Sequence, residues 1–231
     1  MSALGWVVGS ALLCAAAGAG LPRLVAVLPE RNPDVPPTYL DVAARPGLAW
    51  WLAGFAGVVG GLLGWARGGE PDLPAFLVLA VLGTAMGYVD LRRHLLPDRL
   101  TVPTLALGAA LLGVAALVPG GDPATSYPRA WACAGAMMLV HLLLALVYPA
   151  GLGLGDVKLA APLGLYLGWL GWSSAVVGLV AAFLVGGAVG VVLLVLGRAD
   201  RRSAVPFGPS MLVGALLAVL WADPVTAWYL G

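Results

Sequence analysis

Charged residues are scarce in this chain. Only 10% of its 231 residues are Asp, Glu, Lys or Arg, and 61% are hydrophobic. An average soluble domain has about 25% charged and 45–50% apolar residues. The shortage of charge therefore excludes an ordinary soluble domain and indicates a membrane protein. The net charge of +1 carries no sign of a nucleic-acid partner, and none is expected.

Cysteine and histidine are also rare, with two residues of each. Cys14 and Cys133 lie inside apolar runs and form no Cys-x-x-Cys pair, so neither a zinc site nor a disulfide framework is indicated. We expect them to fill apolar space. His94 is expected in a solvated loop, and His141 is expected to be hydrogen-bonded inside a helix bundle. No metal and no cofactor is predicted.

Long apolar runs are abundant instead. A helix needs about 20 apolar residues to cross the hydrocarbon of a bilayer. Eight runs are interpreted as spans: Ala3–Val27, Leu48–Ala66, Leu73–Val89, Thr101–Val118, Ala130–Tyr148, Val157–Trp172, Ser174–Leu196 and Pro206–Leu230. They predict an all-α polytopic membrane helix bundle of about eight transmembrane helices, forming one integral-membrane domain over residues 1–231. The longest polar stretch, residues 29–46, is proline-rich and is interpreted as a loop without a core.

The basic residues predict the orientation of the spans. Cytoplasmic loops are enriched in Lys and Arg. Ten of the twelve basic residues fall in the odd-numbered loops between spans, and only Arg67 and Arg129 fall in the even-numbered ones. We therefore expect a multi-pass protein of the inner or plasma membrane with both termini outside. The first run could also be a cleaved secretory signal, but no positive charge precedes its apolar residues, which favours an uncleaved helix.

Two aspartates lie at the ends of predicted spans. An acidic side chain inside or beside a span is costly and indicates a functional site by default. Asp90 ends the third span and Asp156 precedes the sixth, so the charge count places both at the cytoplasmic face. Asp90 is followed by Arg92 and Arg93. The alternative for Asp90 is an interfacial ion pair with these arginines, which would add little stability at an exposed surface.

Asp156 follows a glycine-rich turn. Gly153 and Gly155 can adopt backbone conformations that other residues avoid and can approach a bound peptide closely. A carboxylate at a helix N-terminus is favoured by the helix dipole, and Lys158 is close in sequence. The alternative is that Asp156 serves only as a helix N-cap. Asp98, after Pro97, is expected to cap the fourth span.

Small residues recur four positions apart in several runs, at Gly57/Gly61, Gly60/Gly64, Gly164/Gly168 and Gly186/Gly190. Such spacings permit close helix approach. They could line a groove for another apolar helix, but for most of them packing between the chain's own helices is favoured.

Three short motifs occur in a fixed order: Asp90 with Leu96-Pro97-Asp98 and Leu100-Thr101, then Gly153-Leu154-Gly155-Asp156-Val157-Lys158-Leu159, then Val205-Pro206-Phe207-Gly208-Pro209. Together they resemble the prepilin peptidases, also called type IV leader peptidases, which are membrane aspartyl proteases of the GxGD class. The resemblance runs from about residue 50 to the C-terminus. Fuller members carry a cytoplasmic domain with paired Cys-x-x-Cys motifs, and this chain has the proline-rich loop 29–46 in that place.

The resemblance implies an aspartic endopeptidase that removes the short leader of type IV prepilins or pseudopilins at the cytoplasmic membrane face. The catalytic pair would be Asp90 and Asp156, and the partners would be the leader, its apolar helix and the lipid bilayer. N-methylation of the product is doubtful in such a short form. Two alternatives remain open: an intramembrane protease of the signal-peptide-peptidase or presenilin type, and a small ion-coupled transporter using the same aspartates, although no internal repeat supports a transporter.

Overall fold

The structure is a computed structural model of the chain. It describes residues 2–29, 37–118, 124–147, 152–197 and 206–230, and for residues 222–230 the backbone alone. Residues 30–36 of the predicted loop and Val205 of the last motif lie outside the described residues. So do four of the basic residues used to predict the orientation, which are Arg31, Arg198, Arg201 and Arg202.

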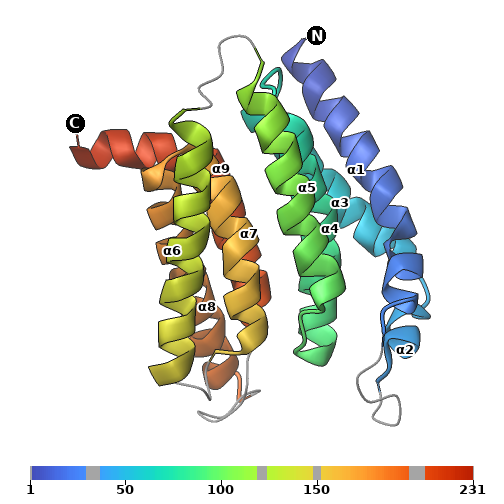
Figure 1. The fold of residues 1–231 in the computed structure, drawn as a ribbon. Helices are drawn as coiled ribbons and strands as arrows, with labels where there is room; N and C mark the ends of the chain where they lie inside the picture. Colours follow the sequence, from blue (N-terminus) through green and yellow to red (C-terminus); the bar gives the residue numbers. More distant parts are fainter. Residues whose placement is uncertain (1, 30–36, 119–123, 148–151, 198–205, 231) are drawn as a thin grey trace. The chain divides into compact units, whose positions relative to one another are not determined.

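Helices make up nearly all of the described chain, and no strand occurs in it (Figure 1). In order they are α1 (Ala3–Ala26), α2 (Tyr39–Ala43), α3 (Leu48–Arg67), α4 (Leu73–Arg93), α5 (Asp98–Ala116), α6 (Ser126–Val147), α7 (Leu154–Leu170), α8 (Trp172–Val195) and α9 (Gly208–Leu230). Each of the eight predicted spans coincides with one long helix, and their ends differ by a few residues. The predicted all-α class is confirmed.

Six of these helices are long and apolar enough to cross a membrane, namely α1, α3, α4, α5, α6 and α8. The prediction of a polytopic helical membrane protein is therefore confirmed. Helix α7 has 17 residues, and the apolar stretch found for α9 is Gly208–Trp221. The count of eight crossings stays a prediction.

The chain divides into two compact units, residues 1–111 and 112–231, and the boundary falls inside α5. The single domain expected over residues 1–231 thus remains a prediction. In the first unit α1 packs along α3, and both contact α4 (Figure 1). A Cβ added at Gly60 would lie 2.6 Å from the Cβ of Cys14, and one at Gly57 would lie 3.2 Å from the Cβ of Ala15. These glycines therefore join the chain's own helices, as expected.

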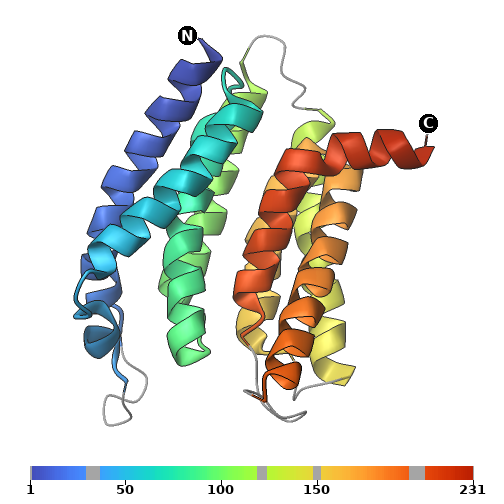
Figure 2. The same cartoon turned by 180° about the vertical axis from the view of Figure 1, so that it is seen from behind.

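In the second unit α6 packs on α7 and α8 packs on α9, while α7 also contacts α8 and α9 (Figure 2). A Cβ added at Gly164 would lie 2.8 Å from the Cα of Ala134, and one at Gly168 would lie 2.8 Å from the Sγ of Cys133. The backbones of α6 and α7 approach closely because these positions carry no side chain. Cys14 and Cys133 are both buried and free, which confirms their expected role as apolar filling.

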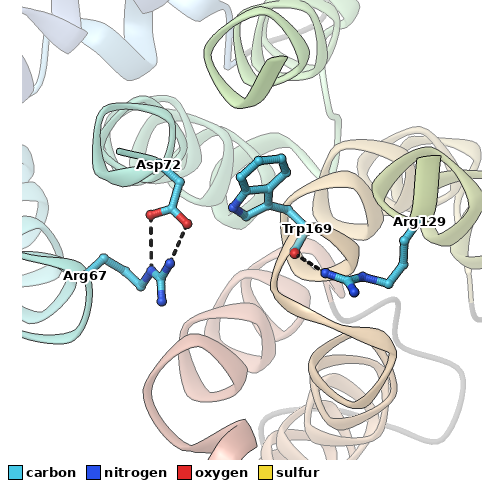
Figure 3. A network of polar contacts seen from close by, with 4 residues as sticks. All are labelled: Arg67, Asp72, Arg129 and Trp169. Atoms are coloured by element: carbon cyan, nitrogen blue, oxygen red, sulfur yellow. Dashed lines mark hydrogen bonds and ion pairs between the residues drawn. The ribbon is translucent and has the colours of Figure 1, made fainter. Parts of the chain in front are cut away.

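Two arginines hold helix ends (Figure 3). Arg67 at the end of α3 forms an ion pair with the buried Asp72, and its Nε donates to Oδ1 of Asp72 over 3.2 Å. Arg129 donates from Nε to the carbonyl of Gly168 over 2.8 Å and from Nη2 to the carbonyl of Trp169 over 2.7 Å. Carbonyls in the last turn of a helix have no partner within it, so Arg129 closes the C-terminal end of α7.

Helix α2 lies inside the stretch that was interpreted as a loop without a core, and that interpretation is wrong for this part. Thr38 accepts from the backbone N–H of Asp41, and Oδ2 of Asp41 accepts from the backbone N–H of Thr38 over 2.8 Å. This reciprocal capping box satisfies two backbone donors of a very short helix. Tyr39 and Val42 are buried, so α2 packs on the rest of the first unit and contacts α1.

Candidate active site

Asp90 lies in the last turn of α4 and is only 4% exposed. The backbone N–H of His94 donates to the carbonyl of Asp90 over 2.8 Å. His94 closes the helix with a left-handed backbone at φ 51°, and its side chain is exposed, as predicted for this histidine. The turn after α4 is therefore sharp, and it leaves the aspartate buried at the end of the helix.

The arginines after Asp90 lie over aromatic rings. The guanidinium of Arg92 is 5.8 Å from the ring centre of Tyr88, and that of Arg93 is 4.2 Å from the ring centre of Tyr39 on α2. The hydroxyl of Tyr88 donates to the carbonyl of Val42 over 2.9 Å. Two contacts thus hold α2 against the turns of α4 that carry Asp90. Sequence reasoning missed this support, although the spacing of Thr38 and Asp41 is a capping signal that could have found it.

Pro97 and Asp98 open α5. The carbonyl of Pro97 accepts from the backbone N–H groups of Leu100 and Thr101 over 2.9 and 3.2 Å, and Asp98 is the first residue of the helix. A negative charge in the first turn is favoured by the helix dipole, which agrees with a role for Asp98 in starting the helix. Its assignment as a cap and not a catalytic residue stays a prediction.

Asp156 lies in the first turn of α7 and is 8% exposed. The residue at the N-cap position is Gly153, and the backbone N–H of Gly153 donates to Oδ2 of Asp156 over 3.0 Å. The alternative role weighed for Asp156, that of the N-cap itself, thus belongs to Gly153. The carboxylate reaches back to a backbone donor instead, which is the second half of a capping box. Gly155 is half-buried and Lys158 is exposed.

Apolar residues flank this carboxylate on both sides in the sequence. Leu152 and Val157 are buried together with Ala145 of α6, and the partly buried Leu142 and Phe207 pack against them. The N-cap and first turn of α7 are therefore anchored in a small apolar cluster within the second unit. His141 of α6 is fully buried, and its Nδ1 lies 2.8 Å from the carbonyl of Met137, which confirms its expected place in the bundle.

Asp90 belongs to the first unit and Asp156 to the second, and their pairing stays a prediction. Within each unit the structure places the aspartate at a helix end with its side chain buried. Among the described residues no group of three or more His, Cys, Asp or Glu side chains is arranged to hold a metal ion. The chemistry that these sites offer on their own is that of carboxyl groups, which can take up and release protons.

Comparison with known proteins places both aspartates in one matched region. The model of the type IV leader peptidase family matches residues 76–200, which include Asp90, Pro97, Asp98 and the whole glycine-rich motif of Asp156. No solved structure gives a significant match to the chain.

Several curated proteins are similar to the chain. The prepilin leader peptidase/N-methyltransferase of Aeromonas salmonicida is 37% identical over 165 residues, which are 70% of this chain and 54% of that protein. The proteins of the same name from Pseudomonas aeruginosa and Stutzerimonas stutzeri are 32% and 31% identical, over 75% of this chain and 58% of each of them. The chain thus spans just over half the length of the curated relatives it matches.

Proposed function

Because the chain belongs to the type IV leader peptidase family, we propose that it is a membrane aspartic endopeptidase that removes the short leader of type IV prepilins or pseudopilins. One observation carries the proposal. The two aspartates that the sequence singles out both lie in the region matched by the family, and each is buried in the terminal turn of a helix. Burying a carboxyl group costs free energy that hydrogen bonds or charge pairing must offset, and buried acidic groups are often found at functional sites.

In the proposed mechanism Asp90 and Asp156 meet and share one proton, because two nearby carboxylates cannot both ionise easily. The ionised carboxylate removes a proton from a water molecule, which then attacks the scissile carbonyl. The protonated carboxyl group hydrogen-bonds to the carbonyl oxygen. The tetrahedral adduct then collapses, the C–N bond breaks, and the leaving amine takes the proton that the base removed from water. No covalent bond to the enzyme forms, and the mechanism needs no metal.

We propose Asp156 as the ionised member of the pair. The backbone N–H of Gly153 donates to its carboxylate, and it lies at the positive end of the α7 dipole. Asp90 lies at the opposite, negative end of α4, where a neutral carboxyl group is less disfavoured. The two groups titrate as a coupled pair, so the assignment describes the state that starts the reaction.

The proposed site lies at the cytoplasmic face of the inner membrane, with both termini outside, because basic residues gather in the odd-numbered loops. The partners are the prepilin leader, the apolar helix that follows it, and the bilayer. The proposal concerns peptidase activity alone. The relatives' names also include a methyltransferase, and the mass of the cleaved product would show whether a methyl group is added.

The test is leader cleavage by purified Asp90→Asn, Asp156→Asn and Asp98→Asn variants, assayed on a type IV prepilin from the same genome. The first two should lower the rate by about 100- to 10,000-fold, because each removes an acid or base from the pair. Asp98→Asn should keep most of the activity, since Asn is also favourable at a helix start.

Normal accumulation of each variant in the membrane is the control for folding. Full activity of Asp90→Asn or Asp156→Asn would overturn the two-aspartate mechanism, and equal loss in all three variants would overturn the division of roles. A wild-type protein that cleaves no prepilin but moves ions across vesicle membranes would support the transporter alternative.

A further inference from the structure

Three rings gather in the second unit, one from each of two helices and one from the turn that opens α9. The ring of His141 on α6 is stacked on that of Phe183 on α8, with centres 5.9 Å apart and planes at 22°. The ring of Phe207 lies 5.1 Å from Phe183 and 6.4 Å from His141. Aromatic pairs at these separations attract each other beyond the area that they bury. We call these three residues the aromatic trio.

A glycine on α8 makes room for the third ring. A Cβ added at Gly186 would lie 2.7 Å from Cε2 and 3.0 Å from Cδ2 of Phe207. Real Cβ atoms do not come so close to a ring, so the ring of Phe207 rests directly on the backbone of α8. The next glycine, Gly187, has nothing within 4 Å of such a Cβ. The space that the ring of Phe207 occupies therefore exists on one face of α8, at Gly186.

The polar part of the trio is fixed by a backbone contact. The Nδ1 of His141 lies 2.8 Å from the carbonyl of Met137, one turn earlier in α6, so this nitrogen carries the proton that it donates. The Nε2 is buried and has no hydrogen-bond partner among the described residues. His141 thus contributes a flat ring held in one orientation, and its second nitrogen makes no bond on which the trio depends.

Phe207 connects the trio to Asp156. It packs against the apolar cluster of Ala145, Leu152 and Val157. Leu152 directly precedes Gly153, whose N–H binds the carboxylate, and Val157 directly follows Asp156. The hydrogen bond between Gly153 and Asp156 is therefore bracketed by two residues of the cluster on which Phe207 rests.

We propose that Phe207, seated between Gly186, His141 and Phe183, is a positioning residue for Asp156. Its ring presses the N-terminal end of α7 into one place and so fixes the carboxylate against the N–H of Gly153. The proposal rests on the proposed function, in which Asp156 is catalytic. Phe207 itself touches no reacting atom, so its effect is on the rate of the chemical step.

The matched test compares Gly186→Ala with Gly187→Ala. Both variants add one methyl group to neighbouring positions of the same helix, with the same gain in helix propensity, but only the first displaces the ring of Phe207. We expect Gly186→Ala to lower kcat for prepilin cleavage by about 10- to 100-fold, because a small misplacement of a catalytic group is costly. KM should change little, and Gly187→Ala should behave as the wild type.

The pH profile of kcat distinguishes a displaced Asp156 carboxylate from a general loss of stability. A loss of stability alone would not change the shape of that profile. A carboxylate that loses an N–H donor holds its proton more tightly. The acid limb of kcat against pH should therefore move to higher pH in Gly186→Ala and in Phe207→Leu. Replacing His141 with Phe keeps a flat ring and should retain activity, whereas His141→Ala should resemble Phe207→Leu.

Phe207→Leu serves as the second variant if Gly186→Ala does not accumulate. Wild-type kinetics in both, or equal loss in Gly186→Ala and Gly187→Ala, would overturn the proposal. So would a lowered kcat with an unshifted pH profile. Asp156→Asn is assayed beside them: its full activity would overturn the proposed function, whereas its inactivity together with normal Gly186→Ala and Phe207→Leu would overturn only the positioning role.

Discussion

The two aspartates lie at opposite ends of their helices and are held by different means. Asp90 lies in the last turn of α4, and Tyr88 and Arg93 of the same helix contact the short helix α2. Asp156 lies in the first turn of α7, and its carboxylate accepts from the backbone N–H of the N-cap residue Gly153. Identical side chains thus meet opposite ends of a helix dipole. This difference is the basis for the proposal that Asp156 is the ionised member of the pair and Asp90 the protonated one.

The two aspartates cannot form a pair if their carboxylates face different sides of the membrane. We expect a cysteine at Leu91 or Leu154, both well exposed beside an aspartate, to react only with thiol reagents that reach the cytoplasm. The distribution of basic residues predicts that both positions lie on that side. The measurement is labelling of intact cells and of opened membranes, in a background where the buried Cys14 and Cys133 are replaced by Ala.

A cysteine at Leu4, at the start of α1, is the control for this experiment. Both termini are predicted to lie outside, so this cysteine should be labelled in intact cells by an impermeant reagent. Opposite labelling of Leu91 and Leu154 positions would exclude the shared proton.

The packing of α7 is expected to show the next largest effect. Gly168→Ala would place a methyl group 2.8 Å from the Sγ of Cys133, so it should destabilise the second unit by about 1–3 kcal/mol, the usual cost of overpacking. Thermal unfolding in detergent measures the loss. Gly135→Ala on α6 is the matched control, because a Cβ there meets nothing within 4 Å. Equal stability of the two variants would contradict the close approach of α6 and α7.

Weakening the contact between α2 and α4 near Asp90 should have a smaller effect on stability and activity. Tyr88→Phe removes the hydroxyl that donates to Val42, and a hydrogen bond of this kind contributes about 0.5–1.5 kcal/mol. We expect faster proteolysis within residues 37–47 and a several-fold lower rate of leader cleavage. Leu40→Ala, on the exposed side of the same helix, should change neither. If Tyr88→Phe leaves both unchanged, α2 has no influence on Asp90.

The smallest effect is expected at the turn after α4. His94 adopts a left-handed backbone at φ 51°, which costs a residue with a side chain about 1–2 kcal/mol relative to glycine. His94→Gly should therefore raise the unfolding temperature slightly, and His94→Val should lower it. Thermal unfolding in detergent compares the three proteins, and a lower temperature for His94→Gly would show that the imidazole itself stabilises the turn.

The long helices could be predicted from sequence because apolar runs of about 20 residues have few other structures open to them. Helix α2 was missed because five residues are too few for a periodic pattern. The helix start near Asp156 was predicted from the glycines that precede it. The identity of the N-cap residue, Gly153, could not be predicted because it depends on local backbone geometry.

Contacts between distant segments were beyond the sequence. The Gly186/Gly190 spacing suggested helix packing, yet Gly186 contacts the ring of Phe207 and Gly190 meets nothing within 4 Å of an added Cβ. Neither the aromatic trio nor the bond from Arg129 to the end of α7 leaves a periodic signal in the sequence. Each depends on contacts between helices that are far apart in the sequence.

The short length of α7 has a consequence for where the leader would be cut. Its 17 residues rise only about 25 Å at 1.5 Å per residue, less than the roughly 30 Å of a typical hydrocarbon core. Arg129 and Asp156 close its two ends, so the helix cannot lengthen without losing these bonds. The sequence predicts that α7 crosses the membrane, and local thinning of the bilayer is one way to accommodate a crossing helix this short. We therefore expect Asp156 to sit at the depth of the lipid headgroups, and cleavage to slow in bilayers made of longer acyl chains.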